Sequence, residues 1–229
     1  MKRAKKIRPN QILQMGEDFG QPFTSFVPQP FSGSMTAFEY IIMIKILNLV
    51  KPIKVFEFGT YMGNTTRFIL ENGLQFSEEK QFIYTLDLND TEGVKFEGND
   101  DALAKKVVGT RRLYQESSYR ERVVQLLGDS LTYDFSSIKH QFQLILIDAN
   151  HALEYVTKDT ENAFSLLDDK STYTIIWDDY EHPSFTDLTA YVDELAYKGR
   201  NIYHVEGTNW AIELSRDLVV PPAIVGVSV

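Results

Sequence analysis

The sequence of 229 residues contains no cysteine. This absence excludes disulfide bonds, zinc sites built on thiolates and a cysteine nucleophile. Any metal that the protein binds must therefore use oxygen or histidine ligands. The absence does not by itself fix the cellular compartment.

Basic residues are fewer than acidic ones: 23 Lys and Arg stand against 32 Asp and Glu, which gives a formal net charge of −9. Phosphate backbones are bound by clustered Lys and Arg, so this balance argues against a nucleic-acid partner. The chief basic cluster is Met1–Arg8. We expect it to be a solvated tail.

A long hydrophobic run is missing as well. The longest apolar stretch, Tyr40–Leu47, contains Lys45 and is far too short to span a bilayer. No apolar segment for export follows the basic start of the chain. These absences predict a cytoplasmic protein without a membrane span.

The composition, 43% hydrophobic and 13% aromatic, suits one sizeable core and hence a single domain over 1–229. We divide it into an N-terminal cap segment and helix over 1–50, a core over 51–215 and an apolar tail over 216–229. The cap segment, with Phe19, Phe23, Phe26 and Phe31, closes over an active site or seals a dimer. The tail docks on its own chain or on a second subunit, so a homodimer is one of the alternatives.

Apolar strand-like runs alternate with helix-like segments, which is typical of a parallel sheet with helices on both faces. Thr36 and Glu39 form a capping box that predicts a helix over Phe38–Val50, and apolar spacing predicts another over Phe185–Leu195. A turn over Val205–Trp210 suggests a hairpin. The predicted strands are Lys54–Phe58, Phe82–Leu86, Arg122–Leu126, Leu144–Ile147, Thr174–Trp177, Ile202–Val205 and Trp210–Leu214.

The most informative motif is the stretch Val55–Thr66, in which an apolar strand runs into a glycine turn that opens a helix. Gly59 and Gly63 allow tight backbone angles, and Glu57 is an acceptor aimed into the crevice where open α/β sheets bind ligands. The spacing lacks the middle glycine of the dinucleotide pattern, because Tyr61 takes its place. A cofactor without phosphate therefore fits better than NAD or FAD.

Acidic residues follow three further predicted strands. Asp87 ends one strand and is placed to accept hydrogen bonds from the hydroxyls of a ribose, or else it caps the next loop. Asp148, Asp178 and Asp179 follow two buried strands and should converge at the same edge of the sheet. Converging carboxylates must be protonated or neutralised by a cation, typically Mg²⁺. The alternative is that one or two of them cap helices or turns.

The motif Glu57–Gly63 resembles the first motif of class I S-adenosylmethionine (SAM) dependent methyltransferases. Further segments follow in the order of that family, namely Tyr84–Asp87, Leu127–Ser130, Leu146–His151 and Ile176–Tyr180. The resemblance covers roughly Thr36 to Leu214. It implies a Rossmann-like α/β fold with a seven-stranded, mostly parallel sheet of order 3-2-1-4-5-7-6 and an antiparallel last strand.

The resemblance also implies SAM as the cofactor and a set of contacts to it. An acid near Gly128–Ser130 meets the adenine amino group in that family, although the triplet alone is an ordinary turn. The implied cofactor residues are Glu57, Gly59, Thr60, Tyr61, Gly63, Asn64, Thr65, Asp87, Gly128, Asp129, Ser130 and Asp148.

Within that family the chain is similar to the cation-dependent small-molecule O-methyltransferases of the catechol and macrolide-sugar types. An acid after strand four and an acidic or amide pair after strand five hold their ion, which implies Asp148, Asp178 and Asp179 here. We therefore expect methyl transfer to a hydroxyl of a small molecule with Mg²⁺ assistance. Asp148 and His151 are the candidate bases, and the alternative for His151 is a cap or packing residue.

Alternative functions remain open at this stage. One is a non-catalytic regulator or scaffold that binds SAM or a nucleotide, and another is a metal-independent methyltransferase acting on nitrogen, sulfur or protein. The segment between Leu88 and Glu121 is expected to act as a lid. Its Arg111 and Arg112 either meet an anionic or sugar-like substrate or belong to a solvated helix face.

Overall fold

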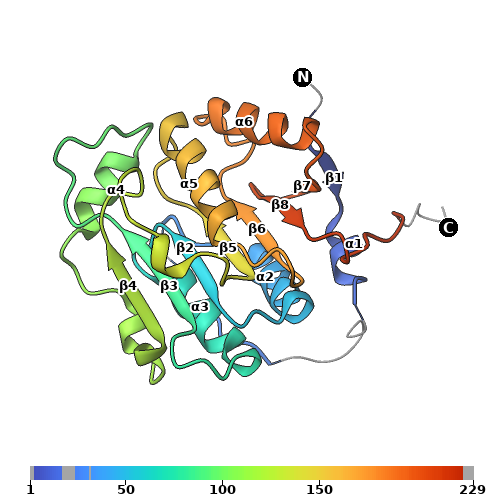
Figure 1. Cartoon of the computed structure of the whole chain (residues 1–229), viewed down its shortest axis with the longest axis horizontal. Coiled ribbons are helices and arrows are strands. Elements are labelled where there is room, and N and C mark those ends of the chain that lie inside the picture. Colours follow the sequence, from blue (N-terminus) through green and yellow to red (C-terminus); the bar gives the residue numbers. More distant parts are fainter. Residues whose placement is uncertain (1–2, 17–23, 31, 224–229) are drawn as a thin grey trace.

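The computed structural model describes residues 3–16, 24–30 and 32–223. The predictions made for Phe19, Phe23, Phe31 and residues 224–229 therefore lie outside the described residues. Within the described part, a central sheet is flanked by helices on both sides (Figure 1).

The sheet has the strand order β1-β7-β8-β6-β5-β2-β3-β4. Strand β8 runs antiparallel to both of its neighbours, and the other neighbouring strands are parallel. The predicted order 3-2-1-4-5-7-6 and the reversed last strand are confirmed for β2 to β8. The strands are β1 (Lys5–Ile7), β2 (Val55–Phe58), β3 (Ile83–Asp87), β4 (Val123–Leu127), β5 (Leu144–Ile147), β6 (Thr174–Trp177), β7 (Ile202–Val205) and β8 (Ala211–Leu214).

The eighth strand, β1, corrects the prediction of a solvated N-terminal tail. Lys5, Lys6 and Ile7 pair in parallel with β7 at the edge of the sheet, where Ile7 is fully buried. The backbone N–H of Ala4 also donates to the Asp193 carboxylate at 2.6 Å. A three-residue edge strand with two exposed lysines has no alternation long enough to recognise in a sequence.

Helices cover both faces of the sheet. They are α1 (Pro9–Leu13), α2 (Ala37–Val50), α3 (Asn64–Gly73), α4 (Asp100–Val107), α5 (Leu153–Leu166) and α6 (Thr186–Tyr197). One apolar cluster joins the sheet to α1, α2 and α3, and a second joins it to α5 and α6. Side chains alternate along a strand, so Val55 lies in the first cluster and Phe56 and Phe58 in the second.

The predicted capping box at the start of α2 is confirmed. The Thr36 hydroxyl accepts a hydrogen bond from the Glu39 N–H at 3.2 Å, and the Glu39 carboxylate accepts one from the Thr36 N–H at 2.7 Å. Lys51, with φ of 47°, ends the helix ahead of Pro52. No described helix is long and apolar enough to cross a membrane.

Part of the apolar tail docks on its own chain. Leu218 and Val220 pack against the first apolar cluster, and the Gln11 amide donates to the carbonyl of Pro221 at 2.6 Å. This supports the first of the two alternatives for residues 218–221. Docking on a second subunit stays a prediction.

Candidate active site

A cavity of about 610 Å³ lies at the carboxyl ends of the parallel strands. Its walls come from the loops after β2 to β6, from α4 of the inserted segment and from residues 33–36, which precede α2. Open α/β sheets bind ligands at this edge, where the loops of neighbouring strands meet. The predicted site residues that line it are Gly59, Tyr61, Asp87, Gly128, Ser130, Asp148, His151, Asp178 and Asp179.

The remaining predicted cofactor residues do not line this cavity. They are Glu57, Thr60, Gly63, Asn64, Thr65 and Asp129. Asn64 instead fastens the cap segment to the loop, because its side-chain amide donates to the Ser34 hydroxyl at 2.8 Å and to the Gln29 carbonyl at 3.2 Å. Asp129 accepts a hydrogen bond from the Tyr155 hydroxyl at 3.2 Å. Asn64 and Asp129 therefore support the walls of the cavity.

Glu57 lies beneath α3, away from the crevice into which the sequence placed its side chain. It sits two residues after Val55 on β2 and so points to the same face of the sheet. The carboxylate is 2% exposed and accepts hydrogen bonds of 2.6 Å from the hydroxyls of Thr66 and Thr85. Burial raises the pKa of Glu57 to about 7, against the effect of the two hydroxyl donors.

This raised pKa predicts a specific pH dependence of stability. A carboxyl group whose pKa rises on folding stabilises the fold below its unfolded pKa, here 4.5, and that contribution is lost as the pH rises through 7. Glu57→Gln stays neutral. The difference in free energy of unfolding between Glu57→Gln and wild type, measured with denaturant, should therefore rise in favour of the variant by about 3 kcal/mol between pH 4.5 and 8. Other titrating groups are common to both proteins and cancel, and parallel pH curves would contradict the assignment.

The backbone that follows the neighbouring strand β5 leaves no room for a side chain at Gly59. Its φ is +89°, and a Cβ atom there would lie 1.9 Å from the carbonyl oxygen of Asp148. The sequence predicted that this glycine allows close backbone approach. The structure identifies the backbone after β5 as one partner of that approach.

Asp87 lines the cavity and forms an ion pair at its outer wall. The Arg112 guanidinium donates to its carboxylate at 2.9 Å, and the Leu88 N–H donates to the other oxygen at 2.9 Å. Burial raises the pKa of Asp87, and Arg112 acts in the opposite direction. Neither Arg111 nor Arg112 lines the cavity. The alternative in which these arginines meet an anionic substrate therefore has no support.

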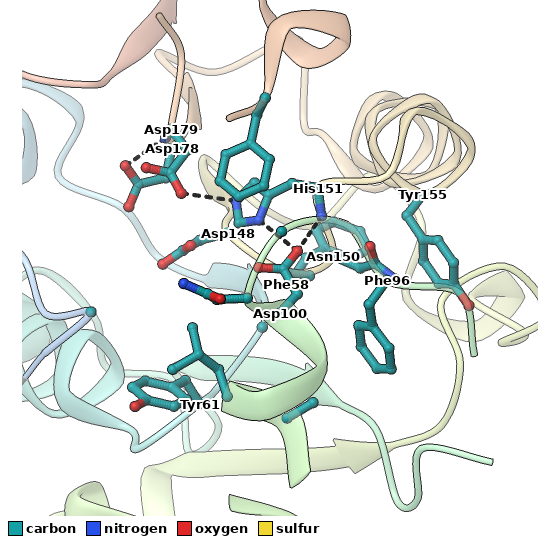
Figure 2. A pocket seen from close by; sticks show the side chains of 18 of the residues that line it. Phe58, Tyr61, Phe96, Asp100, Asp148, Asn150, His151, Tyr155, Asp178 and Asp179 are labelled. Atoms are coloured by element: carbon teal, nitrogen blue, oxygen red, sulfur yellow. Dashed lines mark hydrogen bonds and ion pairs between the residues drawn. The ribbon is translucent and has the colours of Figure 1, made fainter. Parts of the chain in front are cut away.

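Asp148, Asp178 and Asp179 come together at the ends of β5 and β6 (Figure 2). Burial and then the charges of Asp178 and Asp179 raise the pKa of Asp148 well above its usual range. Burial and the charge of Asp179 raise the pKa of Asp178 to about 7. A divalent cation would neutralise this repulsion, and carboxylate oxygens are the ligands that Mg²⁺ prefers. Within the described ranges, however, no three acidic or histidine side chains are close enough to coordinate one ion.

His151 is held in place by an acid from the inserted segment. A single carboxylate oxygen of Asp100, at the start of α4, accepts from the backbone N–H of His151 at 3.0 Å and lies 2.9 Å from its Nδ1 (Figure 2). The ring stacks on Phe185 with centroids 4.2 Å apart. Its Nε2 lies 3.4 Å from a carboxylate oxygen of Asp179 and makes no hydrogen bond.

The environment of His151 changes its basicity. Burial by itself would lower the pKa of the imidazole, but the hydrogen bond and charge of Asp100, together with Asp179 and Asp178, raise it above its ordinary value. The imidazole is fixed through Nδ1, and its buried Nε2 faces the Asp179 carboxylate, which would stabilise a proton taken up there. Sequence reasoning missed Asp100. The only local signal was an acid in the first turn of a helix, which is common at any helix N-terminus.

A sequence model described as a methyltransferase domain matches residues 56–180. No curated protein sequence matches the chain significantly.

Among solved structures, a putative caffeoyl-CoA O-methyltransferase from Staphylococcus aureus is similar, with a TM-score of 0.55, 16% identity and coverage of 82% of this chain and 86% of that one. The Podospora anserina methyltransferase PaMTH1, bound to SAH, gives 0.53, 16% identity and 80% of each chain. CalS11, a TDP-rhamnose 3'-O-methyltransferase of calicheamicin biosynthesis, gives 0.54, 15% identity, and 77% and 78% of the two chains. At these identities the likeness concerns the fold.

Proposed function

Because this chain belongs to the methyltransferase-domain family, whose model matches more than half of its length, we propose that it transfers the methyl group of SAM to a hydroxyl of a small molecule. The observation that carries the proposal is a single cavity. The Gly59 loop, the His151–Asp100 pair and three converging aspartates all line it. The O-methyltransferase names of two similar structures agree with a hydroxyl acceptor.

In the proposed complex, SAM lies over Gly59 and Tyr61 with its adenine beside Gly128–Ser130. Asp87 accepts from the ribose hydroxyls. Its two oxygens already receive the Leu88 N–H and Arg112, but each carboxylate oxygen accepts more than one hydrogen bond. The predicted cofactor residues that do not line the cavity act on SAM indirectly, through the loops that they hold. They are Glu57, Thr60, Gly63, Asn64, Thr65 and Asp129.

Methyl transfer is an in-line displacement, so the acceptor oxygen must be aligned behind the methyl carbon and lose its proton. We assign the proton to Nε2 of His151, which lies 3.4 Å from the Asp179 carboxylate, while Asp100 fixes the ring through Nδ1. Asp148 is the alternative base. If Mg²⁺ binds, Asp148, Asp178 and Asp179 would have to move closer together to hold it, and the bound ion would lower the pKa of a coordinated hydroxyl.

Calorimetric titration with S-adenosylhomocysteine (SAH) tests the cofactor, once with magnesium and once with excess EDTA. We expect binding on the order of micromolar, equivalent to about −8 kcal/mol. Hydroxylated acceptors are then screened for methylation in the presence of magnesium. A well-folded protein that binds no SAH under either condition would overturn the proposed function.

The three aspartates predict magnesium dependence. In the double variant Asp178→Asn, Asp179→Asn, turnover should fall by at least about a hundredfold and no longer respond to magnesium, because two of the three anionic ligands are gone. The matched control is Asp101→Asn, whose exposed carboxylate pairs with Lys105 on α4. The readout is turnover against magnesium concentration, with magnesium binding to the SAH complex measured calorimetrically.

A specific observation favours a metal-independent mechanism as the second candidate. His151 already has an acid partner, whereas the described acidic and histidine side chains form no ready-made coordination shell. Under this alternative, full turnover persists in EDTA and the double variant loses activity only as far as it disturbs the orientation of His151. The same titration of turnover against magnesium decides between the two.

A further inference from the structure

The cavity has an unusually one-sided set of charges. Six carboxylates line it, from Glu39, Asp87, Asp100, Asp148, Asp178 and Asp179. The basic side chains in the lining are those of His151 and His182, and the described part of the lining contains neither lysine nor arginine. Any bound ligand therefore meets a wall that offers hydrogen-bond acceptors and negative charge.

The guanidinium of Arg112, which pairs with the cavity residue Asp87, is already engaged in other bonds. Besides its ion pair with Asp87, it donates to the carbonyl of Val107 and to the hydroxyl of Thr110, the latter at 3.1 Å. Arg112 is buried in this network. Pairing with a phosphate or carboxylate of a ligand would require breaking these bonds, which are charge-assisted or buried.

We infer that the methyl acceptor is a hydroxylated molecule that is neutral or carries an amine, and that it bears neither a phosphate nor a carboxylate. This inference rests on the proposed function and adds the charge class of its substrate. An acceptor anion that leaves water here finds no lysine or arginine to replace its hydration, whereas the carboxylate of SAM or SAH is accompanied by that molecule's own ammonium group. A cationic or neutral molecule faces no such cost here.

The described lining lacks a lysine or arginine whatever the protonation state of its carboxyl groups. A protonated carboxyl group still provides no positive charge, so the argument does not require all six to be ionised. A divalent ion between Asp148, Asp178 and Asp179 would offset two of the six formal charges. The apolar residues Phe96, Leu103 and Phe185 supply the remaining contact surface for the body of a neutral molecule.

Matched acceptors test the charge class. One trio shares a 3,4-dihydroxyphenyl ring and carries an ethyl, an aminoethyl or a carboxyethyl group. A second consists of methyl glucoside, methyl glucosaminide and methyl glucuronide. Binding to the SAH complex is measured calorimetrically, with magnesium and with EDTA, and turnover is measured with SAM.

We expect the neutral and amine members of at least one trio to bind about tenfold more tightly than the carboxylate member. Equal or tighter binding of the carboxylates, or no binding by any member to a protein that binds SAH, overturns the inference alone. Loss of SAH binding overturns the proposed function and the inference with it.

Variants on α4 provide a second, independent test of the charge class. Leu103→Lys places a positive charge in the cavity, and Ala102→Lys places one on the exposed side of the same helix. Affinity for the carboxylate members should rise about tenfold in the first and stay unchanged in the second. Ser184→Lys, at an exposed position of the lining, repeats the test if Leu103→Lys fails to fold. Equal behaviour of the cavity and control variants contradicts the inference.

Discussion

Replacing His151 by glutamine should lower kcat by two to four orders of magnitude, the usual contribution of a positioned acid or base. In the structure, Nε2 of His151 has no hydrogen-bond partner while Nδ1 is fixed by Asp100. Glutamine is of similar size but cannot take up the proton. SAH affinity should change little, because the variant affects the transfer step. The measurement is kcat with a methylated acceptor beside a calorimetric Kd for SAH.

His182→Gln is the matched control for this variant. His182 also lines the cavity, but its Nδ1 accepts only from the backbone N–H of Ser184. Its replacement should leave kcat within a few-fold of wild type. Asp100→Asn keeps an oxygen for the His151 N–H and removes the charge, so kcat should fall to an intermediate value. An unchanged kcat in His151→Gln would make His151 a packing residue, and Asp148→Asn would then test the other base.

Replacing Gly59 by alanine should abolish SAH binding and destabilise the fold by several kcal/mol. A Cβ at this position would lie 1.9 Å from the Asp148 carbonyl oxygen and 2.9 Å from the Ala149 Cα. Both are backbone atoms, so the loop after β2 and the loop after β5 must move apart. The positive φ of +89° adds strain of about 1 to 2 kcal/mol. Denaturant unfolding and SAH calorimetry measure the two effects.

Gly93→Ala separates the strain from the overlap. Its φ is +75°, yet a Cβ there would meet no atom within 4 Å. This variant should lose only the strain contribution of about 1 to 2 kcal/mol and should bind SAH normally. Equal destabilisation of the two variants would show that the contact with Asp148 does not constrain Gly59.

Much of the fold was predictable because its signals are local. The strands over β2 to β8 are apolar runs that end in glycine, acids or turn residues, and the capping box of Thr36 and Glu39 is contained in four consecutive residues. Strand β1 was missed because its stability depends on pairing with β7, which lies far along the chain. A pairing of this kind leaves no periodic signal in three residues.

The candidate site was predictable in part for the same reason. Residues that directly follow a strand, such as Asp148 and Asp178, reach the carboxyl edge whichever way the helices pack. Glu57 was misplaced because its position within β2 turns it to one face, and only the packing of α3 decides what covers that face. Asp100 is 51 positions from His151, and its helix belongs to an insertion without a recognisable motif.

The sequence by itself determined the positions of β2 to β8 along the chain, the glycine turn after β2 and the acids at the strand ends, because each is encoded within a few neighbouring residues. The order of the strands in the sheet was implied by the resemblance to the family. The tertiary structure decided which groups meet. It joined Asp100 to His151, paired Arg112 with Asp87, pressed Asp148 against Gly59 and left the lining that is described without a lysine or arginine. Contacts between distant segments arise from the packing of whole elements, so the composition of a cavity is a property of the fold.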